Sequence, residues 1–193
     1  MFNWAGYINT TKNKLPRQLL VQALEYTKNR EVALDLGAGA LNESKYLLKS
    51  GFKKVIAVDN EENLDLISEI DNRAFSFKKT TIEDYNFSDD YYDLINAQFV
   101  LPFVKKEKID SVINDIKSSL KKDGIFVGQF FGIKDGWHNR TGVYVNTEKE
   151  VKDLLSDLDI VYFKEEEKDG QTAMDGKNIG TFFTLLLKNK YDL

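Results

Sequence analysis

The chain has 193 residues, 42% of them hydrophobic, which fits one globular domain spanning residues 1–193 with a sizeable core. Its 31 acidic and 27 basic residues give a net charge of −4, whereas a surface that binds nucleic-acid phosphates is usually basic. The absence of cysteine excludes disulfides and thiolate metal sites, and the single histidine excludes a histidine-rich metal site, so we expect no bound metal.

The sequence contains no signal for export or for membrane insertion. No apolar run approaches the roughly 20 residues that a membrane span requires. The first residues also lack the charged-then-apolar order of a signal peptide. We therefore expect a soluble cytoplasmic protein with neither a membrane nor a nucleic-acid partner, and the oligomeric state stays open.

Helical and strand-like segments alternate along most of the chain. Hydrophobic spacing predicts, in chain order, a helix that begins near Pro16, a strand at 31–36, a helix at 42–51, a strand at 54–59, a helix at 61–70, strands at 74–79 and 92–98, a helix at 106–122, a strand at 124–132 and a helix at 147–155. Asn42 is expected to cap the second helix and Gly51 to end it. Thr147 and Glu150 stand at capping-box spacing before the last helix.

The C-terminal part of the chain has a different pattern. Residues 159–167 and 181–188 are strand-like and are joined by the glycine-containing stretch 168–180 without a helix, which suits an antiparallel pair. The whole pattern predicts an α/β fold. We expect a Rossmann-like, seven-stranded, mostly parallel sheet with one antiparallel C-terminal strand and helices on both faces.

Ligands of such sheets bind at the carboxyl ends of the strands, so the residues that follow each strand are the most informative. Gly37 and Gly39 follow the first strand and allow a sharp turn and a close approach of a ligand to the backbone. Asp59 ends the second strand, where a carboxylate can accept hydrogen bonds from ribose hydroxyls. A dinucleotide site normally has a third glycine, and here that position is Asn42.

These motifs resemble those of the class I S-adenosylmethionine-dependent methyltransferases. The residues that carry the resemblance are ALDLGAG (33–39), VIAVD (55–59), TTIEDYNFSDDYYDLINA (80–97) and LKKDGIFVGQFFG (120–132). The stretches NAQFVLPFV and GQFFGIKDGW further resemble the small bacterial methyltransferases that are similar to the tellurite-resistance methyltransferase. In class I methyltransferases no pyrophosphate rests on the helix, so the resemblance explains why a third glycine is not needed.

The resemblance implies a binding site for S-adenosylmethionine, with S-adenosylhomocysteine as the product. Gly37 and Gly39, with Asp35 and Ala38 beside them, would line the methionine moiety. Asp59 would bind the ribose. The remaining cofactor residues implied by position are Asn60, Thr81, Ile82 and Glu83 near the adenine, Asn96 and Ala97 near the methionine end, and Arg17 at the cofactor carboxylate. Many relatives have an aspartate where this chain has Thr81. Residues 1–18 would form a lid over the cofactor.

The substrate pocket is expected farther along the same edge of the sheet. Gln98, Phe131, Trp137 and His138 follow the fourth and fifth strands, and we assign them to the pocket wall. Phe99 and Phe130 are interpreted as core residues. His138 has two interpretations, a general base and an exposed loop histidine; the second is slightly favoured, because the flanking Gly136, Asn139 and Arg140 suggest a mobile turn.

The function that we expect is direct, metal-free methyl transfer from S-adenosylmethionine to a small molecule. A methyltransferase acting on a macromolecule is one alternative, and the acidic balance disfavours it. A dinucleotide-dependent enzyme, or a binding protein without catalysis, is the other alternative. The acceptor molecule, its reacting atom and any role in tellurite resistance are not determined by the sequence.

Overall fold

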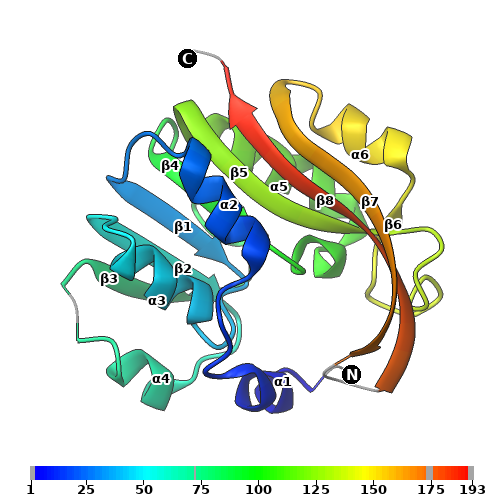
Figure 1. Cartoon of the computed structure of the whole chain (residues 1–193), viewed down its shortest axis with the longest axis horizontal. Coiled ribbons are helices and arrows are strands. Elements are labelled where there is room, and N and C mark those ends of the chain that lie inside the picture. The colour runs from blue at the N-terminus through cyan, green and yellow to red at the C-terminus, as the bar shows by residue number, and fades with distance from the viewer. Residues whose placement is uncertain (1–2, 72, 173–175, 191–193) are drawn as a thin grey trace.

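The computed structural model describes residues 3–71, 73–172 and 176–190. Seven strands form one sheet in the order β3-β2-β1-β4-β5-β8-β7, with a short strand β6 beside β5 (Figure 1). The strands are β1 (Val32–Leu36), β2 (Lys54–Asp59), β3 (Phe75–Lys79), β4 (Tyr92–Ala97), β5 (Leu120–Gly132), β6 (Val145–Asn146), β7 (Leu158–Thr172) and β8 (Gly176–Asn189).

The predicted sheet is confirmed. β8 pairs antiparallel with both β5 and β7, and the other pairs between strands are parallel. The two-residue β6 was not predicted, because its pairing with Phe131 and Gly132 of β5 is visible only in three dimensions.

Helices cover both faces of this sheet (Figure 1). They are α1 (Trp4–Thr11), α2 (Gln18–Tyr26), α3 (Asn42–Lys49), α4 (Leu64–Ser68), α5 (Ile109–Ser119) and α6 (Glu148–Leu154). On one face, apolar residues of α2 pack with Ala33, Val55 and Val127 of the sheet. On the other face, residues of α5 and α6 pack with Leu34 and Phe126. The alternation of side chains along each strand therefore places the two larger hydrophobic clusters on opposite faces of the sheet.

Several local predictions can be compared directly with the structure. The capping box of Thr147 and Glu150 is present at the start of α6. Gly51, which follows α3, has φ +91°, a conformation that favours glycine. The prediction that Asn42 caps α3 is wrong. Leu41 is the N-cap, with φ 61°, and the Asn42 side chain instead donates a hydrogen bond of 2.9 Å to the Thr11 carbonyl of α1.

The N-terminal helix α1 was not predicted as a helix. It begins at Trp4, where the Asn3 side chain accepts a hydrogen bond of 2.9 Å from the Gly6 N–H. α1 lies across the carboxyl ends of the parallel strands and not on a face of the sheet (Figure 1). This placement encloses the edge at which ligands of α/β sheets bind. Residues 1 and 2 of the expected lid lie outside the described residues.

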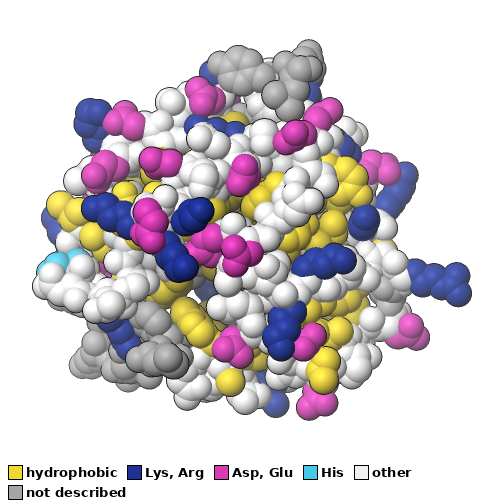
Figure 2. All heavy atoms as spheres, turned by 180° about the vertical axis from the view of Figure 1, so that it is seen from behind, with side chains coloured by type: hydrophobic (Ala, Val, Ile, Leu, Met, Phe, Trp, Pro, Cys, Tyr) yellow, Lys and Arg dark blue, Asp and Glu magenta, His cyan; other side chains and the backbone are white. Residues whose placement is uncertain are grey.

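The face opposite to the view of Figure 1 shows acidic and basic side chains interspersed, with hydrophobic side chains between them (Figure 2). None of the helices in the described part of the chain is long and apolar enough to cross a membrane. Within the same residues, no group of three or more His, Asp or Glu side chains is arranged to hold a metal ion.

Candidate active site

A cavity of about 790 Å³ lies between α1 and the carboxyl ends of the strands. Its wall contains most of the residues that the sequence assigned to a site. They are Arg17, Asp35, Gly37, Ala38, Gly39, Asp59, Asn60, Thr81, Ile82, Glu83, Asn96, Gln98, Phe131 and Trp137. A pocket of this size is typical of small-molecule and cofactor sites.

Each of the two glycines in the loop after β1 is explained by a different feature of its surroundings. Both have positive φ, +67° at Gly37 and +48° at Gly39. A Cβ at Gly37 would lie 2.4 Å from a Val100 methyl carbon, so this glycine permits close packing of the loop on the chain after β4. A Cβ at Gly39 would find no protein atom closer than 3.9 Å. The missing side chain at Gly37 makes room for Val100, whereas the missing side chain at Gly39 leaves space that a ligand can occupy.

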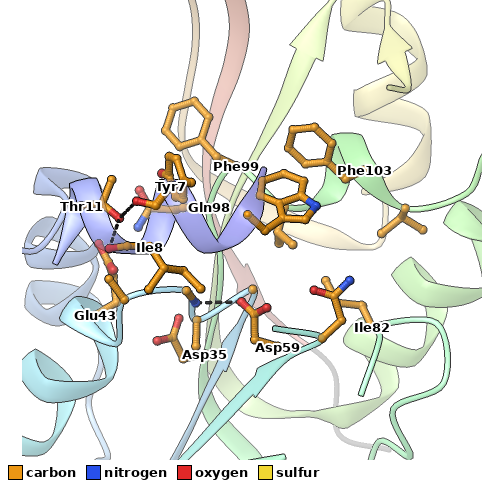
Figure 3. Close-up of a pocket in the computed structure, with 18 of the residues that line it drawn as sticks. Tyr7, Ile8, Thr11, Asp35, Glu43, Asp59, Ile82, Gln98, Phe99 and Phe103 are labelled. Atoms are coloured by element: carbon orange, nitrogen blue, oxygen red, sulfur yellow. Dashed lines mark hydrogen bonds between the residues drawn. The ribbon is translucent and has the colours of Figure 1, made fainter. Parts of the chain in front are cut away.

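Asp59 bridges the glycine loop and the end of β2. One carboxylate oxygen accepts a hydrogen bond of 2.7 Å from the Gly39 N–H (Figure 3). The other accepts one of 2.9 Å from the Glu61 N–H. Burial raises the pKa of Asp59, and the hydrogen bonds from these backbone groups oppose that rise. Each oxygen keeps a further lone pair that can accept from a ligand hydroxyl.

Asp35 is the centre of a buried polar network below the same loop. It accepts hydrogen bonds from Ser44 at 2.6 Å and from the Asn96 amide at 2.8 Å, and the Gln98 amide donates to Asn96 at 2.8 Å. Burial, followed by the negative charge of Glu43, raises the pKa of Asp35 to about 7. The network orients Asn96 and Gln98 at the cavity wall.

Helix α1 and its connection to α2 form the opposite wall. Tyr7, Ile8 and Thr11 of α1 line the cavity (Figure 3). Arg17 donates a hydrogen bond of 3.1 Å to the Tyr7 hydroxyl, and its guanidinium lies 4.6 Å from the centre of the Phe99 ring. The Arg17 backbone N–H also donates to the Glu43 carboxylate at 3.2 Å.

The part of the wall after β3 is held by local hydrogen bonds. The Thr81 hydroxyl donates to the Asp84 carboxylate at 2.8 Å and accepts from the Asp84 N–H at 3.2 Å. The Glu83 carboxylate accepts from the Lys105 N–H at 3.2 Å, which ties this loop to the chain after β4. Ile82 between them is buried.

The other end of the cavity is aromatic. The rings of Trp4 and Phe103 have centres 4.8 Å apart, and Phe103 lies 5.9 Å from Phe131 and 6.2 Å from Trp137. Phe131 and Trp137 are 5.9 Å apart, nearly perpendicular. The cavity therefore has a polar end built on Asp35 and Asp59 and an aromatic end beyond Phe103 (Figure 3).

Two residues assigned from the sequence do not line this cavity. Ala97 is fully buried and packs in the core beneath α5. His138 is exposed; its Nδ1 lies 2.9 Å from the Asp135 carbonyl oxygen and its Nε2 lies 2.6 Å from the Asn139 amide. The same turn is tied to β8, because the Asp135 carboxylate accepts a hydrogen bond of 3.1 Å from the Thr181 N–H.

The interpretation of Phe130 as core is confirmed, since its side chain is fully buried. The same interpretation of Phe99 is wrong. Phe99 adopts φ 56°, is half-buried and lines the cavity, where its ring lies 5.4 Å from that of Phe182. A non-glycine residue with positive φ interrupts the alternation that the strand pattern assumes, so the ring turns towards the cavity.

Sequence reasoning also missed several wall residues. They are Trp4, Tyr7, Ile8, Thr11, Glu43, Asp135 and Phe182. For α1 a signal existed, because Trp4, Ile8 and Thr11 are spaced as one face of a helix. Phe182 gave no such signal, because it belongs to a strand far along the chain that reaches the cavity only through its pairing with β5.

The family model described as a methyltransferase domain matches residues 34–128, which include the glycine loop, Asp59 and the network around Asp35. With the sheet order and the site described above, this match confirms the resemblance to the class I S-adenosylmethionine-dependent methyltransferases that is seen in the sequence.

Particular relatives are more distant. The chain is 26% identical over 169 residues to the human N-terminal Xaa-Pro-Lys N-methyltransferase 1, a match that covers 83% of this chain and 72% of the relative. Its fold is similar to that of TehB from Haemophilus influenzae, with a TM-score of 0.77, 21% identity, and coverage of 97% of this chain and 67% of TehB. It is also similar to the 1,6-didemethyltoxoflavin-N1-methyltransferase of Burkholderia thailandensis, with a TM-score of 0.71, 18% identity, and coverage of 91% and 78% of the two chains.

Proposed function

We propose that this methyltransferase acts on a small molecule and binds S-adenosylmethionine at the polar end of the cavity. The observation that carries this assignment is the open space above Gly39, which the carboxylate of Asp59 borders through its hydrogen bond to the Gly39 N–H. A carboxylate can accept hydrogen bonds from the ribose hydroxyls, and a loop residue without a side chain lets the ligand approach the backbone.

Within this proposal each wall residue has a role. Gly37, Ala38 and Gly39 border the methionine part, Asp59 and Asn60 the ribose, and Thr81, Ile82 and Glu83 the adenine. Asn96, held by Asp35, presents its polar groups at the methionine end. Arg17 accompanies the cofactor carboxylate; it exchanges its contact with Tyr7 or Glu43 for that ion pair.

The chemistry that follows is direct methyl transfer. The bound cofactor supplies an electrophilic methyl group. This chain's residues bind the two reactants, align the acceptor with the methyl–sulfur bond and exclude water. We expect no metal in this step, and turnover of an identified acceptor in the presence of a chelator tests that expectation.

The position of the N-terminal segment over the cavity supports a small acceptor. Residues 1–18 would act as the lid, since α1 covers the carboxyl ends of the strands and is tied to α3 by Asn42 and to α2 by Arg17. One cavity of about 790 Å³ would hold both cofactor and acceptor. The cytoplasmic location stays a prediction from the sequence.

A second candidate is methylation of a peptide amine. It is favoured by one observation, the 26% identity to a human enzyme named for methylation of N-terminal Xaa-Pro-Lys. The position of α1 across the cavity supports the small molecule over the peptide, because a peptide must extend out of the cavity past this helix.

Calorimetric titration with S-adenosylmethionine, S-adenosylhomocysteine, NAD and NADP tests the cofactor assignment. We expect binding of the first two alone, and binding of NAD or NADP would contradict it. Methyl transfer from labelled cofactor to small amines, thiols and phenols, compared with a tripeptide with a free amino terminus, then tests acceptor size. Faster transfer to the tripeptide would favour the second candidate.

A further inference from the structure

The cavity wall contains a buried carboxylate that none of the proposed cofactor contacts uses. Asp135 follows β5, lines the cavity and is only 2% exposed. Its two oxygens accept backbone hydrogen bonds, at 2.8 Å from the Trp137 N–H and at 3.1 Å from the Thr181 N–H. Trp137 and Phe182, the residue after Thr181, are both aromatic and line the same cavity as Asp135.

The negative charge of Asp135 has no cationic partner in the part of the chain that the structure describes. The three basic residues of the cavity wall, Lys14, Arg17 and Lys105, make no ion pair with it, and Arg140 lies 4.9 Å above the Trp137 ring instead. Two neutral hydrogen bonds reduce the cost of burying a carboxylate, but they leave its charge uncompensated. A ligand cation would supply that compensation.

The aromatic rings of the cavity wall also favour a positively charged ligand. The faces of Trp and Phe attract cations within about 6 Å of the ring centre, and this attraction is stronger where water is excluded. Phe103, Phe131 and Trp137 lie within contact distance of one another in the wall of the same cavity as Asp135. An aromatic box with one carboxylate recognises a positively charged nitrogen that carries an apolar body, whereas a carboxylate or phosphate ligand would be repelled.

We propose that the methyl acceptor is a small amine with an apolar or aromatic body, bound as its ammonium form between the rings and Asp135. This inference rests on the proposed function. For transfer, the nitrogen first loses one proton to water. Its lone pair then forms the new carbon–nitrogen bond, while the methyl–sulfur bond breaks and leaves its electron pair on sulfur. The methylated amine remains a cation that the same box accommodates until release.

The test uses the whole chain saturated with S-adenosylhomocysteine and three probes that share one ring, benzylamine, benzyl alcohol and benzoate, titrated at pH 7. Because a charge-assisted hydrogen bond is worth about 1.5–3 kcal/mol, benzylamine should bind about tenfold or more tightly than benzyl alcohol. Benzoate should bind least. Asp135→Asn should remove the preference for benzylamine over benzyl alcohol.

Asp115→Asn is the matched control, because it removes the same charge from an exposed position on α5. It should leave all three affinities unchanged. Equal or tighter binding of benzyl alcohol or benzoate, or no binding of benzylamine, would overturn the inference. The wild-type comparison of the three probes decides this even if Asp135→Asn fails to fold. If S-adenosylhomocysteine itself does not bind, the proposed function fails; if it binds and the amine is not preferred, only this inference fails.

Discussion

The carboxylate of Asp59 and the backbone N–H of Gly39 are joined by a hydrogen bond of 2.7 Å, across 20 positions of the chain. This bond holds the end of β2 against the loop after β1, and both residues line the cavity. A single carboxylate therefore orders the loop and faces the proposed ribose.

Replacing Asp59 with alanine should weaken S-adenosylmethionine binding at least about tenfold, since hydrogen bonds to a carboxylate contribute about 1.5–3 kcal/mol each. Calorimetry measures the affinity and thermal unfolding checks the fold. Asp71→Ala removes an exposed carboxylate and should change neither. An unchanged affinity in folded Asp59→Ala protein would refute the ribose assignment.

Replacing Gly39 with valine should abolish cofactor binding, because the new side chain would point into the open space above the loop. The positive φ of +48° adds about 1–2 kcal/mol of backbone strain. Gly51→Val is the control, since Gly51 also has positive φ, +91°, and does not line the cavity. A Cβ at Gly51 would meet no atom within 4 Å. Gly51→Val should lose stability but keep binding. Retained affinity in Gly39→Val protein would place the cofactor elsewhere.

The free energy of unfolding should depend on pH through Asp35, whose pKa rises from its ordinary value of 3.8 to about 7 on folding. Between these values the folded state holds a proton that the unfolded state releases, so this contribution is full below pH 3.8 and is lost as the pH rises to about 7. Chemical denaturation of wild-type and Asp35→Asn protein across this range measures it. The free energy of unfolding of the Asp35→Asn protein relative to that of the wild type should increase as the pH rises. A difference that does not depend on pH would contradict the raised pKa.

The exposed position of His138 leads to a prediction about turnover. His138→Ala should keep cofactor binding and lose at most about tenfold in turnover, well below the upper end of the range of about 10²–10⁴-fold expected for a lost general base. Trp137→Ala should cause a larger loss, because it opens the aromatic end to water. Steady-state kinetics with an identified acceptor compares the two. A loss of about a thousandfold in His138→Ala protein with unchanged cofactor affinity would instead make the histidine the base.

The sequence by itself determined the elements whose signals are local. The apolar spacing of Ile109, Val112, Ile113 and Ile116 predicts the buried face of α5, and all four are buried in the structure. Gly37, Gly39 and Asp59 were placed correctly at the ends of β1 and β2, because a strand pattern ends where the turn residues begin. These features depend on neighbours within a few residues, which a linear reading can see.

Only the tertiary structure decided which distant residues share the cavity. Asp135 is held by Thr181, 46 positions away, and Asn42 was expected to cap its own helix but bonds to Thr11, 31 positions away. Phe99 leaves the core because its backbone adopts positive φ after β4. Such choices depend on long-range packing and on the hydrogen bonds available in the folded chain, and the energies involved outweigh local propensity.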